Sequence, residues 1–129
     1  MTAAFKLTSR DFRGVISQRF ARNFLPLPAL TKFQIGQTLP DFELPVSGQR
    51  ASIKLSNYHH KQVIVLVFTR IFTEKQYCPF CYPHILSMVE TYGQFEKMGA
   101  EVLMITSTDM RQSKVIQRDL NITMPLLVD

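Results

Sequence analysis

The sequence is poor in the residues on which several protein classes depend. It has only two cysteines, no tryptophan, five glycines and seven prolines in 129 residues. Two cysteines cannot hold together a small disulfide-rich scaffold, and so few glycines and prolines exclude collagen-like and low-complexity chains. The longest apolar run, residues 63–68, is far too short to cross a bilayer. These absences leave a soluble protein, which we expect to lie inside the cell.

The apolar content is sufficient for one ordinary hydrophobic core. Hydrophobic residues make up 46% of the chain, and ten phenylalanines and four tyrosines are among them. The length is close to the commonest domain size. We therefore expect one folded domain.

The net charge of +5 is concentrated in residues 1–34, which we predict to be a basic extension and linker before a domain of residues 35–129. This extension has six basic residues against one acidic residue, whereas residues 35–129 have nine of each. Its charged residues are Lys6, Arg10, Arg13, Arg19, Arg22, Lys32 and Asp11.

A basic, arginine-rich extension has three interpretations. It is compatible with contact to nucleic acid or an anionic membrane, and also with an organellar transit peptide. We favour a third, in which its phenylalanines pack on the domain while its arginines stay in water. We therefore expect no nucleic-acid partner, no membrane association and a cytoplasmic location, with organellar targeting left open.

The patterns after residue 34 predict an α/β sandwich. Residues 40–44 and 51–55 alternate apolar and polar side chains around Ser47-Gly48, which is typical of a half-buried β-hairpin. Residues 63–68 are apolar at every position, which predicts a strand covered on both faces. The remaining elements are a helix around residues 85–95 that ends near Gly99, a buried strand at 101–106, a short helix at 109–120 and a third strand at 124–128. This order predicts two parallel crossover connections.

Both cysteines lie in one tetrapeptide, Cys78-Pro79-Phe80-Cys81, between a predicted strand and a predicted helix. The first turn of a helix has unpaired N–H groups and a partial positive charge, which favour thiolate over thiol. The first cysteine of such a motif commonly has a pKa between about 3.5 and 7.5. The second cysteine is placed to attack a mixed disulfide formed by the first. Pro79 suits a first helical turn, where its missing N–H costs nothing.

The cysteines have two alternative uses besides redox chemistry. They could be inert core residues, or half of a zinc site completed by His84, His59 or His60. A structural zinc site usually has two well-spaced ligand pairs, and the sequence has no second Cys-x-x-Cys and no His-x-x-x-His. We therefore favour a redox-active dithiol, and expect no metal and no cofactor.

Several neighbours of the cysteines are candidate supporting residues. Tyr77 and Phe80 flank the thiols, either to shield them from water or to form a docking surface. Arg70 and Lys75 would add positive potential beside a thiolate. His84 either stabilises a thiolate and relays a proton or is simply an exposed helix residue.

The chain resembles a known family over residues 35–129. Residues 35–44, 53–58 and 63–68 resemble the opening of alkyl hydroperoxide reductase/thiol-specific antioxidant (AhpC/TSA) proteins. The segment from Phe68-Thr69-Arg70 to Tyr77-Cys-Pro-Phe-Cys81 resembles the peroxiredoxin-like branch with a Cys-Pro-x-Cys motif. Residues 99–105 and 124–129 match that branch too.

The resemblance implies a thioredoxin-like α/β sandwich with an N-terminal β-hairpin and thiol-dependent redox chemistry. The implied enzyme cycles between the Cys78/Cys81 dithiol and the disulfide. Its substrate is a peroxide or a protein disulfide, and a thioredoxin- or glutathione-type system reduces it. Two non-enzymatic alternatives stay open: a redox sensor or binding module, and an inactive truncated fragment.

The residue that reacts first is left open by the family pattern. Typical members place Thr or Ser three residues before the peroxidatic cysteine, a position held here by Lys75 before Cys78 and by Cys78 before Cys81. The family also has proline seven residues before the peroxidatic cysteine. The residue at that distance is Ile71 for Cys78 and Glu74 for Cys81. An overlay on the family's Thr-x-x-Cys makes Cys81 the peroxidatic equivalent. Comparison with thioredoxin favours Cys78 as nucleophile and Cys81 as the resolving thiol.

The family continues beyond the position of Asp129 with a strand pair, a final helix and an arginine that supports the peroxidatic thiolate. The resemblance therefore implies that the C-terminal part of the fold is missing from this chain. We expect the strand at residues 124–128 to have an open edge, which a homo-oligomeric contact would cover.

Overall fold

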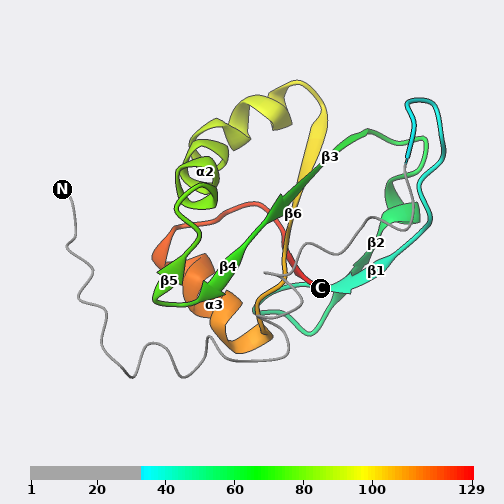
Figure 1. Cartoon of the computed structure of the whole chain (residues 1–129). Coiled ribbons are helices and arrows are strands. Elements are labelled where there is room, and N and C mark those ends of the chain that lie inside the picture. The colour runs from blue at the N-terminus through cyan, green and yellow to red at the C-terminus, as the bar shows by residue number, and fades with distance from the viewer. Residues whose placement is uncertain (1–32) are drawn as a thin grey trace.

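A three-stranded parallel sheet forms the centre of the protein in the computed structural model, which describes residues 33–129 (Figure 1). Strand β6 (Ala100–Thr106) lies between β3 (Val63–Thr69) and β7 (Leu126–Val128). Strands β3 and β6 pair along their whole length, up to the pair Thr69 and Thr106. The predictions made for residues 1–32 lie outside the described residues.

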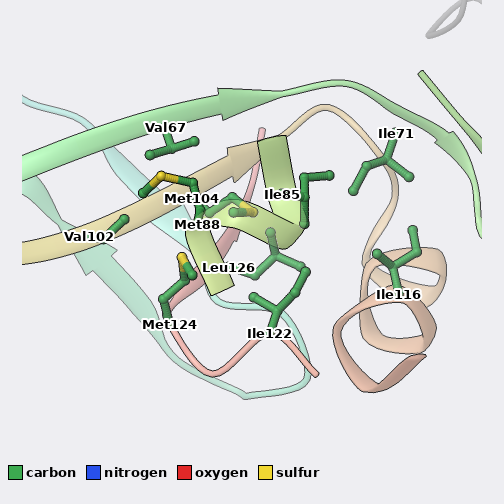
Figure 2. Packing of buried hydrophobic residues seen from close by; sticks show 10 residues of the cluster. All are labelled: Val67, Ile71, Ile85, Met88, Val102, Met104, Ile116, Ile122, Met124 and Leu126. Carbon is green, nitrogen blue, oxygen red and sulfur yellow. The ribbon is translucent and has the colours of Figure 1, made fainter. Parts of the chain in front are cut away.

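Both helices pack on one face of this sheet. Helix α2 (Cys81–Lys97) connects β3 to β6, and helix α3 (Met110–Asp119) connects β6 to β7, which gives the two predicted parallel crossovers. Side chains alternate between the faces of a strand, so every second residue of β6 points at the helices. The resulting buried cluster consists of Val67, Ile71, Ile85, Met88, Val102, Met104, Ile116, Ile122, Met124 and Leu126 (Figure 2).

The opposite face of the sheet is covered by the predicted β-hairpin. Strands β1 (Glu43–Pro45) and β2 (Ser52–Lys54) pair antiparallel, and a 3-10 turn, η1 (Leu55–Tyr58), follows them. Val46 forms an antiparallel bridge with Leu127, and the Ser47 N–H donates a 2.7 Å hydrogen bond to the Leu126 carbonyl. These contacts attach the hairpin to β7.

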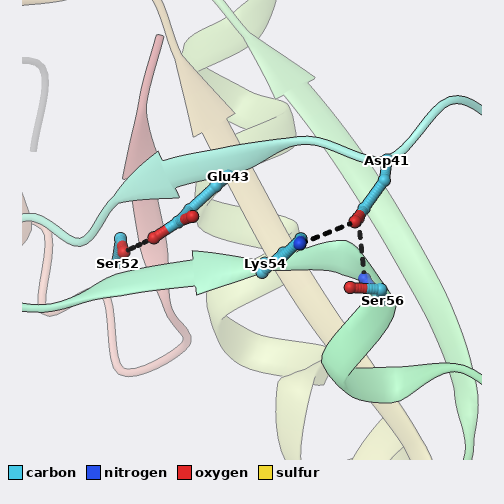
Figure 3. A network of polar contacts seen from close by, with 5 residues as sticks. All are labelled: Asp41, Glu43, Ser52, Lys54 and Ser56. Carbon is cyan, nitrogen blue, oxygen red and sulfur yellow. Dashed lines mark hydrogen bonds and ion pairs between the residues drawn. The ribbon is translucent and has the colours of Figure 1, made fainter.

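Polar contacts hold the hairpin to the turn that follows it (Figure 3). The Ser56 N–H donates a 2.9 Å hydrogen bond to Asp41 Oδ1, and Lys54 Nζ lies 3.4 Å from Asp41 Oδ2. The Ser52 hydroxyl donates to the Glu43 carboxylate. Desolvation raises the pKa of Asp41, but the hydrogen bond from Ser56 and the Lys54 ammonium lower it more, so the net pKa lies below its ordinary value. All these side chains are exposed, so the network fixes geometry more than it adds stability.

The predicted coverage of residues 63–68 on both faces is confirmed for the middle of the run: Val65 and Val67 pack on the helix-facing side, and Ile64 and Leu66 pack on the hairpin side. The two ends of the run differ from the prediction. Val63 is 69% exposed and Phe68 is 71% exposed. Within the described residues β3 pairs with β6 alone, whereas β6 has a neighbour on each side and is buried from Val102 to Thr106. An all-apolar run therefore marked an edge strand here, and β6 is the most enclosed strand.

The open sheet edge was also predicted in the wrong place. All three residues of β7 are buried, and Val46 bridges its outer side. The unpaired edge, among the residues described, belongs to β3. The homo-oligomeric contact that was expected to cover the edge at residues 124–128 remains a prediction.

An additional hairpin that the sequence did not predict joins β3 to α2. Strands β4 (Ile71–Thr73) and β5 (Gln76–Tyr77) pair antiparallel with a shift in register. Ile71 is only 1% exposed and belongs to the helix-facing cluster. The connection to the cysteine motif is thus anchored in the core.

Neither helix in the described part of the chain has the length and apolar character needed to span a membrane.

Two glycines with open surroundings should respond to alanine in opposite directions. Gly99, just after α2, has a φ of +77°, a conformation that strains any L side chain, so Gly99→Ala should destabilise the fold by about 1–2 kcal/mol. Gly93 lies within α2 with no atom within 4 Å of an added Cβ, so Gly93→Ala should stabilise by about 0.5–1 kcal/mol. Urea denaturation measures both, and equal shifts would contradict the conformational explanation.

Candidate functional site

Both cysteines line an open cleft at the carboxyl ends of the sheet strands. Its volume is about 440 Å³, and Phe68, Thr69, Arg70, Cys78, Phe80, Cys81, Ile105, Thr106, Ser107 and Asp129 line it. These residues come from the ends of β3 and β6, from the turn before α2 and its first residue, and from the residue after β7. The carboxyl ends of parallel strands are the usual place for a ligand in an open α/β sheet.

The local backbone places Cys78 at the entrance of α2. The Cys78 carbonyl accepts hydrogen bonds from the N–H groups of Cys81, at 3.0 Å, and Tyr82, at 2.9 Å. Helix α2 begins at Cys81, so Pro79 lies in the turn before the helix. The prediction had placed it in the first helical turn. Cys78 therefore faces the helix N-terminus, where unpaired N–H groups concentrate.

This position favours the thiolate form of Cys78. Partial burial raises the pKa of Cys78, but hydrogen bonds from the Cys81 backbone and thiol and from the Phe80 N–H lower it, with a smaller contribution from the charge of Arg70. As a result, the pKa of Cys78 lies below the ordinary value for a thiol. Cys78 is thus the more acidic of the two thiols.

The pKa of Cys81 is shifted in the opposite direction, above its ordinary value. Burial raises its pKa, and the neighbouring Cys78 raises it further, because one thiolate disfavours a second. The Arg70 N–H and the Thr69 hydroxyl lower the pKa of Cys81, but not enough to reverse the shift. Both cysteines are free thiols and half-buried.

Some of the predicted supporting residues line the cleft, and others lie away from it. Arg70 and Phe80 line the cleft, and Phe80 is 90% exposed at its rim. Tyr77 instead packs against the core cluster and the ring of Tyr82, 5.1 Å away between centroids. His84 is exposed on the first turn of α2 and does not line the cleft.

The histidines considered as zinc ligands lie elsewhere. His59 and His60 stack against each other beside the hairpin, where they line a second cleft of about 480 Å³ that contains neither cysteine. Residues 33–129 contain no group of three or more His, Cys, Asp or Glu side chains that could hold a metal ion. The thiol cleft, although slightly smaller, is the one that carries nucleophiles.

Sequence reasoning missed four polar residues of the cleft: Thr69, Thr106, Ser107 and Asp129. Their signal was positional, since each lies at or just after the carboxyl end of a predicted parallel strand. Parallel strands bring those ends to one edge of the sheet, next to the start of the helix that follows the first strand. Applied to the predicted strands, this rule would have selected them.

Residues 35–129 match the model of the AhpC/TSA family. The chain belongs to this family. The match confirms the resemblance to the AhpC/TSA family that was found in the sequence.

Solved structures agree with this assignment at the level of the fold. This AhpC/TSA chain is similar to PrxQ from Xylella fastidiosa, solved as a mutant, with 26% identity, a TM-score of 0.63 and coverage of 75% of this chain and 60% of that one. It is also similar to peroxidoxin BcpB from Mycobacterium tuberculosis, with 23% identity, a TM-score of 0.62 and coverage of 73% and 58%. The fold is thus a thioredoxin-like α/β sandwich, and the chain spans about three fifths of the length of these proteins.

The opposite pKa shifts predict different pH dependence of alkylation for the two thiols. Iodoacetamide reacts with thiolates, so each rate rises with pH through the pKa of its thiol. Because the pKa of Cys78 is lowered and that of Cys81 is raised, Cys78 should reach its maximal rate at a lower pH. Peptide mass spectrometry after timed alkylation between pH 5 and pH 10 separates them, and coincident profiles would contradict the assignment.

Proposed function

We propose that this AhpC/TSA chain is a thiol-dependent oxidoreductase that cycles between a Cys78/Cys81 dithiol and a disulfide. Cys78 is the attacking thiolate and Cys81 the resolving thiol. The oxidant is a peroxide or a protein disulfide, and a thioredoxin- or glutathione-type dithiol system returns the protein to its reduced state.

One observation carries this proposal: the two thiols share a cleft but have opposite environments. The Cys81 and Phe80 N–H groups and the helix N-terminus favour the thiolate of Cys78. Cys81, one turn along, is kept protonated by burial and by its neighbour. A low-pKa thiol beside a higher-pKa thiol suits a sequence of attack and then resolution.

The peroxide reaction follows from these roles. The Cys78 thiolate attacks one oxygen of the peroxide, the O–O bond breaks, and Cys78 becomes a sulfenic acid while the departing alkoxide or hydroxide takes a proton. Cys81 then loses its proton and attacks the Cys78 sulfur. The disulfide forms, and the hydroxyl group leaves as water. With a disulfide as oxidant, a thiolate leaves at each of the two steps instead.

Near-stoichiometric hydrogen peroxide tests the peroxidase form of the proposal. The reduced protein is mixed with peroxide, quenched with an alkylating agent at a series of times, and its intact mass is measured. Loss of both alkylatable thiols far faster than in a free-cysteine control is expected for a peroxidase. Oxidation no faster than the control would exclude peroxide as the substrate and leave disulfide exchange as the form to test with oxidised thioredoxin or oxidised glutathione.

A further inference from the structure

The end of strand β3 places a buried hydroxyl beside the resolving thiol. Thr69 is the last residue of β3, and it is 5% exposed. Val65 and Val67 precede it by four and two residues and pack on the helix-facing side of the sheet. Side chains of a strand alternate, so Thr69 points to the same side, where α2 begins with Cys81.

The Thr69 hydroxyl has no hydrogen-bond partner. Three buried side-chain atoms of the described residues share this condition: Ser47 Oγ, Thr69 Oγ1 and Gln112 Oε1. Only Thr69 among them lines the cleft that holds the cysteines. Burial of an unpaired hydroxyl costs free energy, and a valine of nearly the same shape would avoid that cost. A hydroxyl at this place is therefore suited to a partner that forms during the reaction.

Cys81 is the group in the cleft that such a donor would assist most. Its thiol is half-buried next to Cys78, and it must become a thiolate before it can attack. The charged groups that line the cleft around it are Arg70 and Asp129. The Arg70 N–H and the Thr69 hydroxyl both lie near enough to the Cys81 sulfur to lower its pKa, although the Thr69 hydroxyl makes no formed hydrogen bond in the resting protein. A hydrogen bond completed by Thr69 would stabilise the negative charge that develops on sulfur.

We propose that Thr69 donates its hydroxyl hydrogen bond to the Cys81 sulfur as Cys81 attacks oxidised Cys78, and so accelerates the resolving step. This inference rests on the proposed function and assigns a role within it. Cys81 loses its proton to solvent, its thiolate forms the bond to the Cys78 sulfur, and the group bound to Cys78 leaves with the electron pair of the broken bond. Thr69 keeps its proton throughout.

An aromatic disulfide, dithiobis-nitrobenzoate, separates the two steps without peroxide. Attack by Cys78 releases one coloured nitrobenzoate thiolate and leaves a mixed disulfide, and resolution by Cys81 releases the second. Stopped-flow absorbance follows both phases, and Cys81→Ser identifies the first because it releases only one equivalent. In Thr69→Val the ratio of the second rate to the first should fall about tenfold. In Thr69→Ser, which keeps the hydroxyl, the ratio should stay within about threefold of the natural protein.

Each outcome has a defined meaning. A fall in Thr69→Val that Thr69→Ser restores supports the hydroxyl as the donor. An unchanged ratio in Thr69→Val, or an equal fall in both variants, overturns the inference, because the hydroxyl is then idle or the effect is one of packing. If Thr69→Val does not fold, Thr69→Ala takes its place in the comparison. Failure of the proposed function looks different: the natural protein itself releases no second equivalent from an intramolecular step.

Discussion

Replacement of Cys78 by serine is expected to slow the first oxidation step by on the order of a hundredfold or more, to the rate of an ordinary thiol. Serine cannot be oxidised by peroxide, and its hydroxyl is not ionised at neutral pH. The remaining thiol, Cys81, has a pKa raised by burial, so little of it is thiolate. Stopped-flow oxidation with dithiobis-nitrobenzoate, or timed peroxide oxidation read by intact mass, measures this loss.

Cys81→Ser is the matched control, since it removes one sulfur atom from the same turn of the chain. This variant should keep a fast first step and stop there, either at a mixed disulfide or at a sulfenic acid that dimedone traps. A reversed pattern, with a fast first step in Cys78→Ser and a slow one in Cys81→Ser, would assign the attacking role to Cys81. That is the assignment obtained by overlaying the family's Thr-x-x-Cys on Cys78-x-x-Cys81.

The parts of the fold that depend on local pattern were predictable from the sequence. Helical spacing of apolar residues predicted α2, and Gly99 after its last turn has the positive φ expected there. Alternation predicted the β1–β2 hairpin, and short runs of apolar residues predicted β3, β6 and β7. These signals lie within about ten residues of chain, so one sequence is enough to detect them.

The errors concern relations between distant segments. The burial of β3 and β6 depends on which strand has two neighbours, and nothing within residues 63–68 records that order. The edge of β7 is closed by Val46, which lies about eighty residues earlier. The same reason explains why Tyr77 was placed at the site, although its ring packs in the core, while Thr69 was missed. The dithiol was found because its two members are adjacent in sequence.

The packing of α2 on the sheet is the second feature for which a large effect is expected. Ile85 is fully buried in the helix-facing cluster, four residues after Cys81, and so holds the first turns of α2 against β3 and β6. Ile85→Ala removes that side chain and leaves a cavity, so it should lower the free energy of unfolding by about 2–5 kcal/mol. This is a large share of the roughly 5–15 kcal/mol that stabilises a typical domain. Urea denaturation followed by circular dichroism measures the change.

Ile35→Ala is the matched control, because it makes the same chemical change at a fully exposed position. Its effect should stay within about 0.5 kcal/mol. Equal losses in the two variants would show that burial against the sheet is not what stabilises α2. The same two proteins connect packing to chemistry, because the thiolate of Cys78 depends on N–H groups at the start of α2. In native buffer the alkylation profile of Cys78 should therefore move to higher pH in Ile85→Ala and stay in place in Ile35→Ala.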